Sequence, residues 1–131
     1  MIIRPDDVPE TPQDPRPLAL KRVINFEAHT PDISVTWVRL WGHHDRVVNQ
    51  ISDRVYYVID GEARFQVGDG SPIEGVAAGD FVFIPRNVPY EFEGTMRYIV
   101  MNGPAYRPDS DIKLPSVFHA SDSDEAPATV G

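Results

Sequence analysis

The sequence predicts an all-β domain, folded as an antiparallel sandwich or barrel with little or no helix. Apolar and β-branched runs of about four to eight residues recur along the chain, which is a typical strand length. Glycine, proline or an Asp-Gly pair separates most of these runs, and no stretch has a convincing helical periodicity. The chain has 131 residues, of which 41% are hydrophobic, so it is long enough for one domain with one packed core.

We divide the chain into a barrel domain with two flanks. Residues 1–17 contain five prolines and are expected to form an extended arm, either flexible or packed along a partner subunit. Residues 18–106 are expected to form the barrel. Residues 107–131 are expected to be a partly disordered C-terminal segment, because residues 120–131 are acidic and rich in small side chains.

The first two strands are expected in residues 18–27 and from Asp32 onward. Residues 18–27 are ambiguous between a strand and a short helix, and their β-branched and aromatic side chains favour a strand. The run after Asp32 alternates between two faces, and Gly42 is expected to end it before a polar segment. The alternating residues are Ile33, Val35 and Trp37 on one face and Ser34 and Thr36 on the other.

The remaining strands are expected to be short and joined by turns. The pairs Asp60-Gly61 and Glu93-Gly94 are interpreted as turns that end strands, and Gly68-Asp69-Gly70 as a further turn. The strands between the turns are predicted at residues 54–59, 63–67, 73–76, 81–84, 89–92 and 96–101.

Charge and composition exclude several classes of function. The formal net charge of −8 argues against nucleic-acid binding, because phosphate contacts need a basic surface. There is no cysteine, which excludes disulfides, thiolate catalysis and cysteine-based zinc sites. No apolar run is long enough to span a membrane, and the first residues do not have the pattern of a signal peptide. We therefore expect a cytoplasmic protein with no membrane partner.

Two glycine-containing segments resemble the motifs of a known family. Gly42 and Gly61 keep the spacing of the first motif of the cupin superfamily, and Gly79 and Pro85 keep the spacing of the second. Over about residues 33–103 the chain therefore resembles the cupins, which are small β-barrels. The resemblance implies a double-stranded β-helix, also called a jelly roll, with a ligand cavity inside the barrel.

The metal-binding positions that this resemblance implies hold other residues here. Arg54 stands at the glutamate position and Tyr90 at the last histidine position. An arginine places a permanent positive charge where a carboxylate would meet the cation. We therefore expect no metal at this site, no other cofactor and no dioxygenase activity. Depending on the spacing chosen, the two remaining histidine positions fall on Val48 and Gln50 or on Val47 and Asn49.

The same alignment predicts which side chains face the cavity. If Arg54 points inward, strand alternation turns Tyr56 and Val58 in the same direction. Tyr90 and Phe92 are expected to face them from the opposite sheet. The predicted ligand-binding residues are Gln50, Asn49, Arg54, Tyr90 and Phe92.

Arg54 is open to two interpretations. Its planar guanidinium suits a carboxylate or phosphate held by two hydrogen bonds, with Tyr90 as a further donor, so the ligand is expected to be a small acidic or polar metabolite. Alternatively, Arg54 pairs with an internal acid or lies at the mouth in solvent, because an unpaired buried charge is costly. The candidate acids are Asp53, Glu62 and Glu91.

Tyr90, Tyr56 and Arg54 are the candidate catalytic residues. A nearby guanidinium lowers the pKa of a phenol, so either tyrosine is a candidate to donate or accept a proton. The resemblance implies metal-free relatives with such chemistry, which suits a metal-independent isomerase, lyase or cyclase. The alternative is a non-catalytic binding or sensing domain in which both tyrosines are structural.

His43 and His44 form the other candidate site. Adjacent residues on a strand face opposite sides, so at most one of them enters the cavity. That histidine is interpreted as a general base, or as a ligand together with Tyr90 and Asp45 in the rearranged site of a metal-dependent enzyme. Otherwise both histidines belong to a surface loop.

The resemblance also implies a homodimer, formed through an edge strand or through the N-terminal arm. The expected partners are thus a small anionic ligand and a second copy of the chain.

Overall fold

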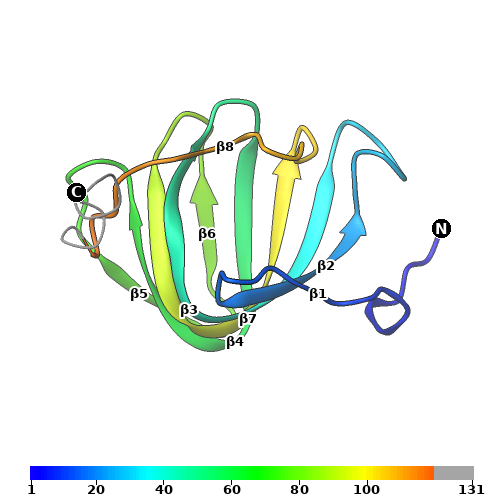
Figure 1. Cartoon of the computed structure of the whole chain (residues 1–131), viewed down its shortest axis with the longest axis horizontal. Helices are drawn as coiled ribbons and strands as arrows, with labels where there is room; N and C mark the ends of the chain where they lie inside the picture. Colours follow the sequence, from blue (N-terminus) through cyan, green and yellow to red (C-terminus); the bar gives the residue numbers. More distant parts are fainter. Residues whose placement is uncertain (120–131) are drawn as a thin grey trace.

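The computed structural model describes residues 1–119, which form a barrel of antiparallel strands (Figure 1). The predicted all-β fold is confirmed. Within this range the only helical element is a short 3-10 turn, η1 (Pro5–Asp7). The strands are β1 (Thr11–Pro12), β2 (Leu18–Ile24), β3 (Ser34–Asn49), β4 (Asp53–Val67), β5 (Glu74–Ala77), β6 (Phe81–Ile84), β7 (Tyr90–Gly103) and β8 (Asp111–Lys113).

Three long strands form most of the barrel. β3, β4 and β7 have 16, 15 and 14 residues, and β7 pairs with both of the others. The strand order is β1-β2-β3-β7-β4-β5, while β6 pairs with β4 and β8 pairs with β3. Figure 1 shows the long strands curving around the barrel, so one strand contributes to more than one wall.

Three glycines that the sequence predicts as strand ends lie inside continuous strands instead: Gly42 in β3, Gly61 in β4 and Gly94 in β7. Gly61 has a φ of +83°, and a Cβ atom there would lie 2.2 Å from the backbone oxygen of Thr95. A glycine is needed here because β4 and β7 approach closely beside a β-bulge, which leaves no room for a side chain. A bulge and a tight turn favour the same residues, so the sequence alone does not distinguish them. The predicted turn at Asp60-Gly61, where a strand was expected to end, is therefore wrong.

The predicted polar segment after Gly42 is in fact the second half of β3, so its side chains alternate between the inside and the outside of the barrel. At the start of the strand, the face that begins with Ser34 points inward. Ser34 and Val38 are 4% and 3% exposed, whereas Ile33 is 46% exposed. The predicted alternation is thus present, but its more hydrophobic set of residues faces outward.

The shorter strands agree with the sequence. β2 lies within the predicted range 18–27, and β6 has the predicted bounds 81–84. β5 begins and ends one residue later than the predicted range 73–76. The glycine-rich turn at residues 68–70 lies between β4 and β5, as predicted.

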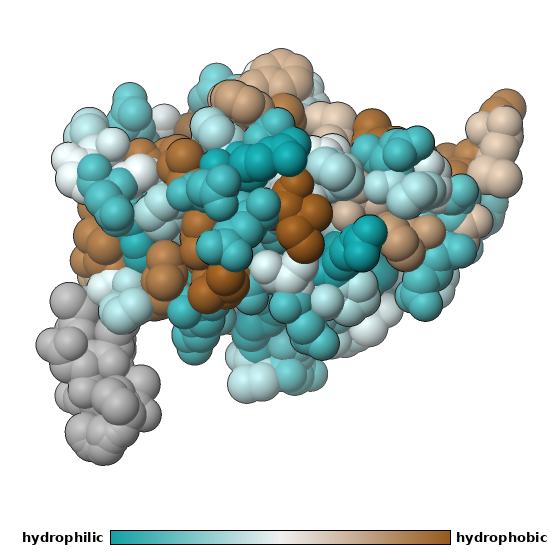
Figure 2. All heavy atoms as spheres, turned by 90° about the horizontal axis from the view of Figure 1, so that it is seen from above, coloured by the Kyte–Doolittle hydropathy of each residue, from teal (hydrophilic) through white to brown (hydrophobic). Residues whose placement is uncertain are grey.

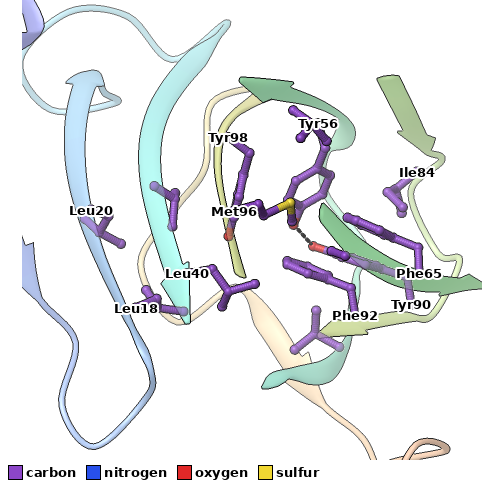
Figure 3. Packing of buried hydrophobic residues seen from close by; sticks show 14 residues of the cluster. Leu18, Leu20, Leu40, Tyr56, Phe65, Ile84, Tyr90, Phe92, Met96 and Tyr98 are labelled. Carbon is purple, nitrogen blue, oxygen red and sulfur yellow. Dashed lines mark hydrogen bonds between the residues drawn. The ribbon is translucent and has the colours of Figure 1, made fainter. Parts of the chain in front are cut away.

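The hydrophobic core is dominated by aromatic rings (Figure 3). Tyr90, Phe92 and Val58 have no exposed surface. Phe65 stacks on Phe92 with ring centroids 4.4 Å apart. This packing holds Tyr90 in one position, with its hydroxyl directed at the hydroxyl of Tyr56 in Figure 3.

Both flanks contact the barrel. β1 of the N-terminal arm pairs with β2 of the same chain, and Glu10 binds Arg39 of β3 at 3.0 Å. On the C-terminal side, β8 pairs with β3. Thr11–Pro12 of the arm and Asp111–Lys113 therefore pair with strands of the barrel, while the predicted disorder of residues 120–131 falls outside the described residues.

Figure 2 shows the molecule from above, on the end that β8 crosses in Figure 1. Hydrophilic side chains cover much of this end, with smaller hydrophobic areas between them. None of the helical residues in the described part of the chain forms a segment long and apolar enough to cross a membrane.

Candidate functional site

A cavity of about 90 Å³ lies between β2, β3, β4 and β7. Part of its lining is apolar and comes from Leu18, Leu20, Val38 and Val100. A cavity of this size has room for several water molecules or for a small organic group. Its polar lining includes His44, Arg54, Tyr56, Asn102, Tyr106 and Asp111.

Arg54 points into the barrel and is 4% exposed. Its Nη2 donates to Asp111 Oδ1 at 2.6 Å, and its Nη1 donates to the Tyr90 hydroxyl at 2.5 Å. Asp111 belongs to β8, so the acid that neutralises Arg54 comes from the C-terminal flank. The predicted partners were Asp53, Glu62 and Glu91, and none of these bonds to Arg54. Because both terminal nitrogens are engaged, Arg54 does not offer a free two-pronged clamp to a ligand.

The tyrosines continue the hydrogen bonds of Arg54 into the cavity. The hydroxyls of Tyr90 and Tyr56 are 2.5 Å apart (Figure 3). Since Tyr90 accepts from Arg54, its own proton is free to be donated to Tyr56. Tyr56, which lines the cavity, then directs its O–H toward whatever occupies the cavity. Chains of this kind polarise each member, so Arg54 also acts on the Tyr56 hydroxyl.

Both phenols stay protonated. Burial raises the pKa of Tyr56 well above its ordinary value, and the neighbouring Tyr90 raises it further, while Arg54 opposes the shift only in part. Burial also raises the pKa of Tyr90 despite the lowering effect of Arg54. The expectation that Arg54 lowers the phenol pKa is therefore corrected: burial outweighs the guanidinium. The two tyrosines can donate protons but do not act as bases.

His44 supplies the missing base. It is buried on the inward face of β3 and lines the cavity. Its Nδ1 lies 2.8 Å from the backbone oxygen of Asp45, which can only accept, so Nδ1 carries the proton and Nε2 carries a free lone pair. Burial lowers the pKa of His44 from 6.5 to about 4, which keeps the ring neutral at physiological pH. The ring stacks on Phe92 at 4.4 Å, which fixes its plane.

His43 faces away from the cavity, as the alternation of a strand requires. Its Nε2 contacts the buried carboxylate of Glu91, and its ring packs against His119 with centroids 4.8 Å apart. Only one of the two histidines therefore enters the barrel. The alternative in which both lie on a surface loop is corrected, because β3 continues through them.

Four predicted ligand-binding residues lie outside the cavity lining, and Tyr90 is one of them, because its buried hydroxyl contacts Arg54 and Tyr56 instead. Gln50 is exposed, in the turn after β3. Asn49 is buried but binds the turn, because its side-chain oxygen accepts from the backbone amides of residues 51 and 52 and its Nδ2 donates to Asp111. Phe92 is fully buried beneath His44. Phe92 therefore faces the interior as predicted, whereas Gln50 does not. The Asn49 side chain is directed at Asp111 and at the turn.

The cavity lining also contains polar residues that the sequence did not predict, among them Asn102, Arg22 and Asp111. Asn102 lies two positions after Val100 on β7, and Arg22 lies two positions after Leu20 on β2, so each faces the cavity like its neighbour. Strand periodicity was the signal that could have found them. Asp111 had no comparable signal, because its segment has no periodicity and reaches the barrel only through pairing with β3.

The residues at the usual metal positions of this fold do not fit a metal. Arg54 offers a cation where a carboxylate is needed, and the oxygen of Asn49 is occupied by backbone amides. Among residues 1–119, no three histidine, cysteine, aspartate or glutamate side chains are grouped so as to hold an ion. The rearranged site was predicted to combine one histidine with Tyr90 and Asp45. His44 faces the interior, but Asp45 is 32% exposed and pairs with Lys113 at 3.8 Å, so it does not complete such a site.

We expect Tyr90→Phe to lower the free energy of unfolding by about 1–2 kcal/mol, because it leaves the buried Nη1 of Arg54 without an acceptor. Urea denaturation of the purified variant measures this. Tyr57→Phe is the control, since it removes the same hydroxyl from a tyrosine of β4 that lies on the face opposite to Arg54, and it should change the value by less than about 0.5 kcal/mol. Equal stability of Tyr90→Phe and the wild type would show that the hydroxyl does not stabilise Arg54.

The fold and cavity define this chain as a cupin-type barrel, and comparisons with known structures agree. No protein-family model and no curated protein matches the sequence. Among solved structures, the Streptomyces nucleoside dehydratase Pac13 is similar at 18% identity, with a TM-score of 0.73 over 87% of this chain and 90% of that one.

Two further solved structures show the same likeness. The polyketide cyclase RemF from Streptomyces resistomycificus is 19% identical, with a TM-score of 0.74 over 93% of this chain and 90% of that one. KdgF from Halomonas sp. is 20% identical, with a TM-score of 0.67 over 83% and 98%. At these identities the likeness shows the fold alone. Solved variants of Pac13 with uridine replace one of two tyrosines by phenylalanine or a histidine by glutamine.

Proposed function

We propose that this protein is a metal-independent lyase that removes water from a small polar metabolite inside the barrel. The observation that carries the proposal is the meeting of a base and an acid in one cavity. His44 presents an unprotonated Nε2, and Tyr56 presents a hydroxyl that Tyr90 and Arg54 polarise. Separate acid and base groups are what an elimination reaction requires.

The reaction proceeds by two proton transfers. His44 Nε2 takes a proton from a carbon next to a carbonyl group of the substrate. The electron pair of that bond forms a carbon–carbon double bond as the neighbouring carbon loses its hydroxyl. Tyr56 donates a proton to this hydroxyl, which leaves as water. Solvent then takes the proton from His44 and returns one to Tyr56, so neither group is consumed.

The comparisons support the proposal at the level of chemistry. One structural neighbour is a nucleoside dehydratase and another is a polyketide cyclase. The dehydratase variants solved with uridine alter two tyrosines and a histidine, and this chain has the same residue types at its cavity: His44 and Tyr56 line it, and Tyr90 is hydrogen-bonded to Tyr56. With 18% identity, uridine itself is not carried over to this chain.

The test is an activity screen with substitutions on both faces of β3. Small β-hydroxy carbonyl compounds are incubated with the enzyme in the presence of EDTA, and mass spectrometry follows the loss of one water. We expect His44→Gln to lower the rate at least about a hundredfold, since it removes the base, and Tyr56→Phe to have a similar effect. Circular dichroism checks that each variant is folded.

The neighbouring residues provide matched controls. His43→Gln and Tyr57→Phe change the same residue types on the opposite face of the same strands, and we expect both variants to retain the wild-type rate. An equal loss of rate in His43→Gln and His44→Gln would refute His44 as the base. Saturable binding without turnover across the panel would identify a binding protein instead, and turnover that EDTA abolishes would refute the metal-independent mechanism.

A further inference from the structure

Two arginines of the cavity lining have no acidic partner among the described residues. Arg22 extends from β2, with its guanidinium 6.0 Å from the ring of Tyr106. Arg16 lies just before β2, and within residues 1–119 its side chain makes one hydrogen bond, a long one of 3.4 Å to the side-chain oxygen of Gln13. By contrast, Arg54 in the same lining is paired with Asp111. Both Arg16 and Arg22 are exposed, so they stand where the cavity opens to solvent.

The cavity is therefore positive within a negative protein. Its lining contains three guanidiniums, those of Arg16, Arg22 and Arg54, and one carboxylate, that of Asp111. Asp111 is already bonded to Arg54 and Asn49. The whole chain has a net charge of −8, so the excess of positive charge is a local feature of this cavity. A cleft lined by charges of one sign concentrates ions of the opposite sign.

The three guanidiniums act on one place. Burial raises the pKa of Tyr106, and Asp111 raises it further, while Arg54, Arg22 and Arg16 all oppose the shift. Arg22 and Arg54 also lie over the ring of this tyrosine, at 6.0 and 5.6 Å. Arg16 and Arg22 both line the cavity, and both of their charges act on Tyr106.

Deeper in the same cavity, two buried donors have no acceptor. Arg54 Nε and Asn102 Nδ2 make no hydrogen bond among the described residues, and both side chains are only 4% exposed. Buried N–H groups of this kind nearly always have a partner in a folded protein, and each orphan calls for an explanation. An occupant with several acceptor oxygens would satisfy them.

We infer that the metabolite carries a carboxylate or phosphate group, which Arg16 and Arg22 bind at the mouth of the cavity, while its reacting part extends inward to the orphan donors of Arg54 and Asn102. The inference rests on the proposed function for the reaction that this binding serves. The anion site is thus placed at Arg16 and Arg22, which have no acidic partner among the described residues, and not at Arg54, whose terminal nitrogens already bind Asp111 and Tyr90. Their forked donors suit both oxyanions.

The test measures binding without turnover. Inorganic phosphate and acetate are titrated separately into the protein at low ionic strength, with isothermal calorimetry or NMR as the readout. We expect saturable binding by the wild type, a loss of affinity of at least about fivefold in Arg16→Gln or Arg22→Gln, and no saturable binding in the double variant. The ion that binds more tightly identifies the group as phosphate or carboxylate.

Arg4→Gln is the matched control, because it makes the same change of charge at an exposed arginine outside the cavity. It should leave the affinity within about twofold of the wild type. Equal affinities of the wild type and the double variant would overturn the inference, and so would an equal loss in Arg4→Gln.

His44→Gln separates the two proposals. It should leave phosphate or acetate affinity unchanged while it abolishes turnover. Anion binding that depends on Arg16 and Arg22, combined with turnover that does not depend on His44, would refute the proposed function and keep the anion site. Turnover of an uncharged substrate that depends on His44 and is the same in the double arginine variant would refute the anion site alone.

Discussion

Asp111→Ala is expected to lower the free energy of unfolding by about 3 kcal/mol, because it leaves a buried cation without its partner. Arg54 is 4% exposed, and its guanidinium stays charged in any protein environment, so it cannot escape the penalty by losing a proton. The 2.6 Å bond to Asp111 is its only ion pair among the described residues. Urea denaturation at pH 7 measures the loss.

A second substitution shows whether the buried charge is the cause. Arg54→Met removes the cation and fills similar space, so the double variant Arg54→Met/Asp111→Ala should recover at least half of the stability lost by Asp111→Ala. Glu10→Ala provides the surface control: it breaks the 3.0 Å pair with Arg39, which is 48% exposed, and should cost no more than about 1 kcal/mol. If Asp111→Ala costs as little as this control, the buried pair does not stabilise the barrel.

The second large effect is a loss of stability of about 3 kcal/mol between pH 6.5 and pH 4, caused by His44. Burial lowers the pKa of this histidine from 6.5 to about 4 in the folded protein, against the weaker raising effects of the Asp45 carbonyl and Asp111. Between these pH values the unfolded chain binds a proton that the folded chain does not. The free energy of unfolding therefore rises with pH across this window, and the contribution is complete above pH 6.5.

Denaturation curves at several pH values measure the slope, and His44→Gln removes it. The carboxylates whose pKa values are lowered in the fold, among them Glu91 and Glu93, lose their stabilising effect only below their ordinary value of 4.5. Their contribution therefore falls at the acidic end of the window. We expect the variant to be less dependent on pH than the wild type from 6.5 down to about 4.5. Parallel curves for the two proteins would contradict a buried, neutral His44.

Strand alternation accounts for the part of the site that the sequence predicts. Arg54 and Tyr56 lie two residues apart on one strand, so a single inward assignment places both. Their burial at 4% and 2% agrees with that assignment, and Tyr90 faces them across the barrel as expected. The catalytic and ligand-binding roles predicted for these residues remain proposals.

Strand length explains why the sequence left open whether a histidine enters the cavity or both lie on a surface loop. Gly42 carries the same local signal whether it ends a strand or allows one to bend. Only its place opposite Gly94 in the neighbouring strand shows that β3 continues past it. Because β3 continues, His44 points into the cavity and His43 points away from it. His44 is therefore the base in the proposed mechanism.

The sequence by itself determined the all-β class, the inward face of β4 and the absence of the usual metal ligands, because strand periodicity and residue chemistry are local properties. Only the tertiary structure decided that Asp111 neutralises Arg54, that burial keeps Tyr56 and Tyr90 protonated, and that Arg16 and Arg22 line the cavity without an acidic partner among residues 1–119. The reason is that charge pairing and desolvation depend on residues that the chain brings together from far apart. Arg54 and Asp111 are separated by 57 positions and meet at 2.6 Å.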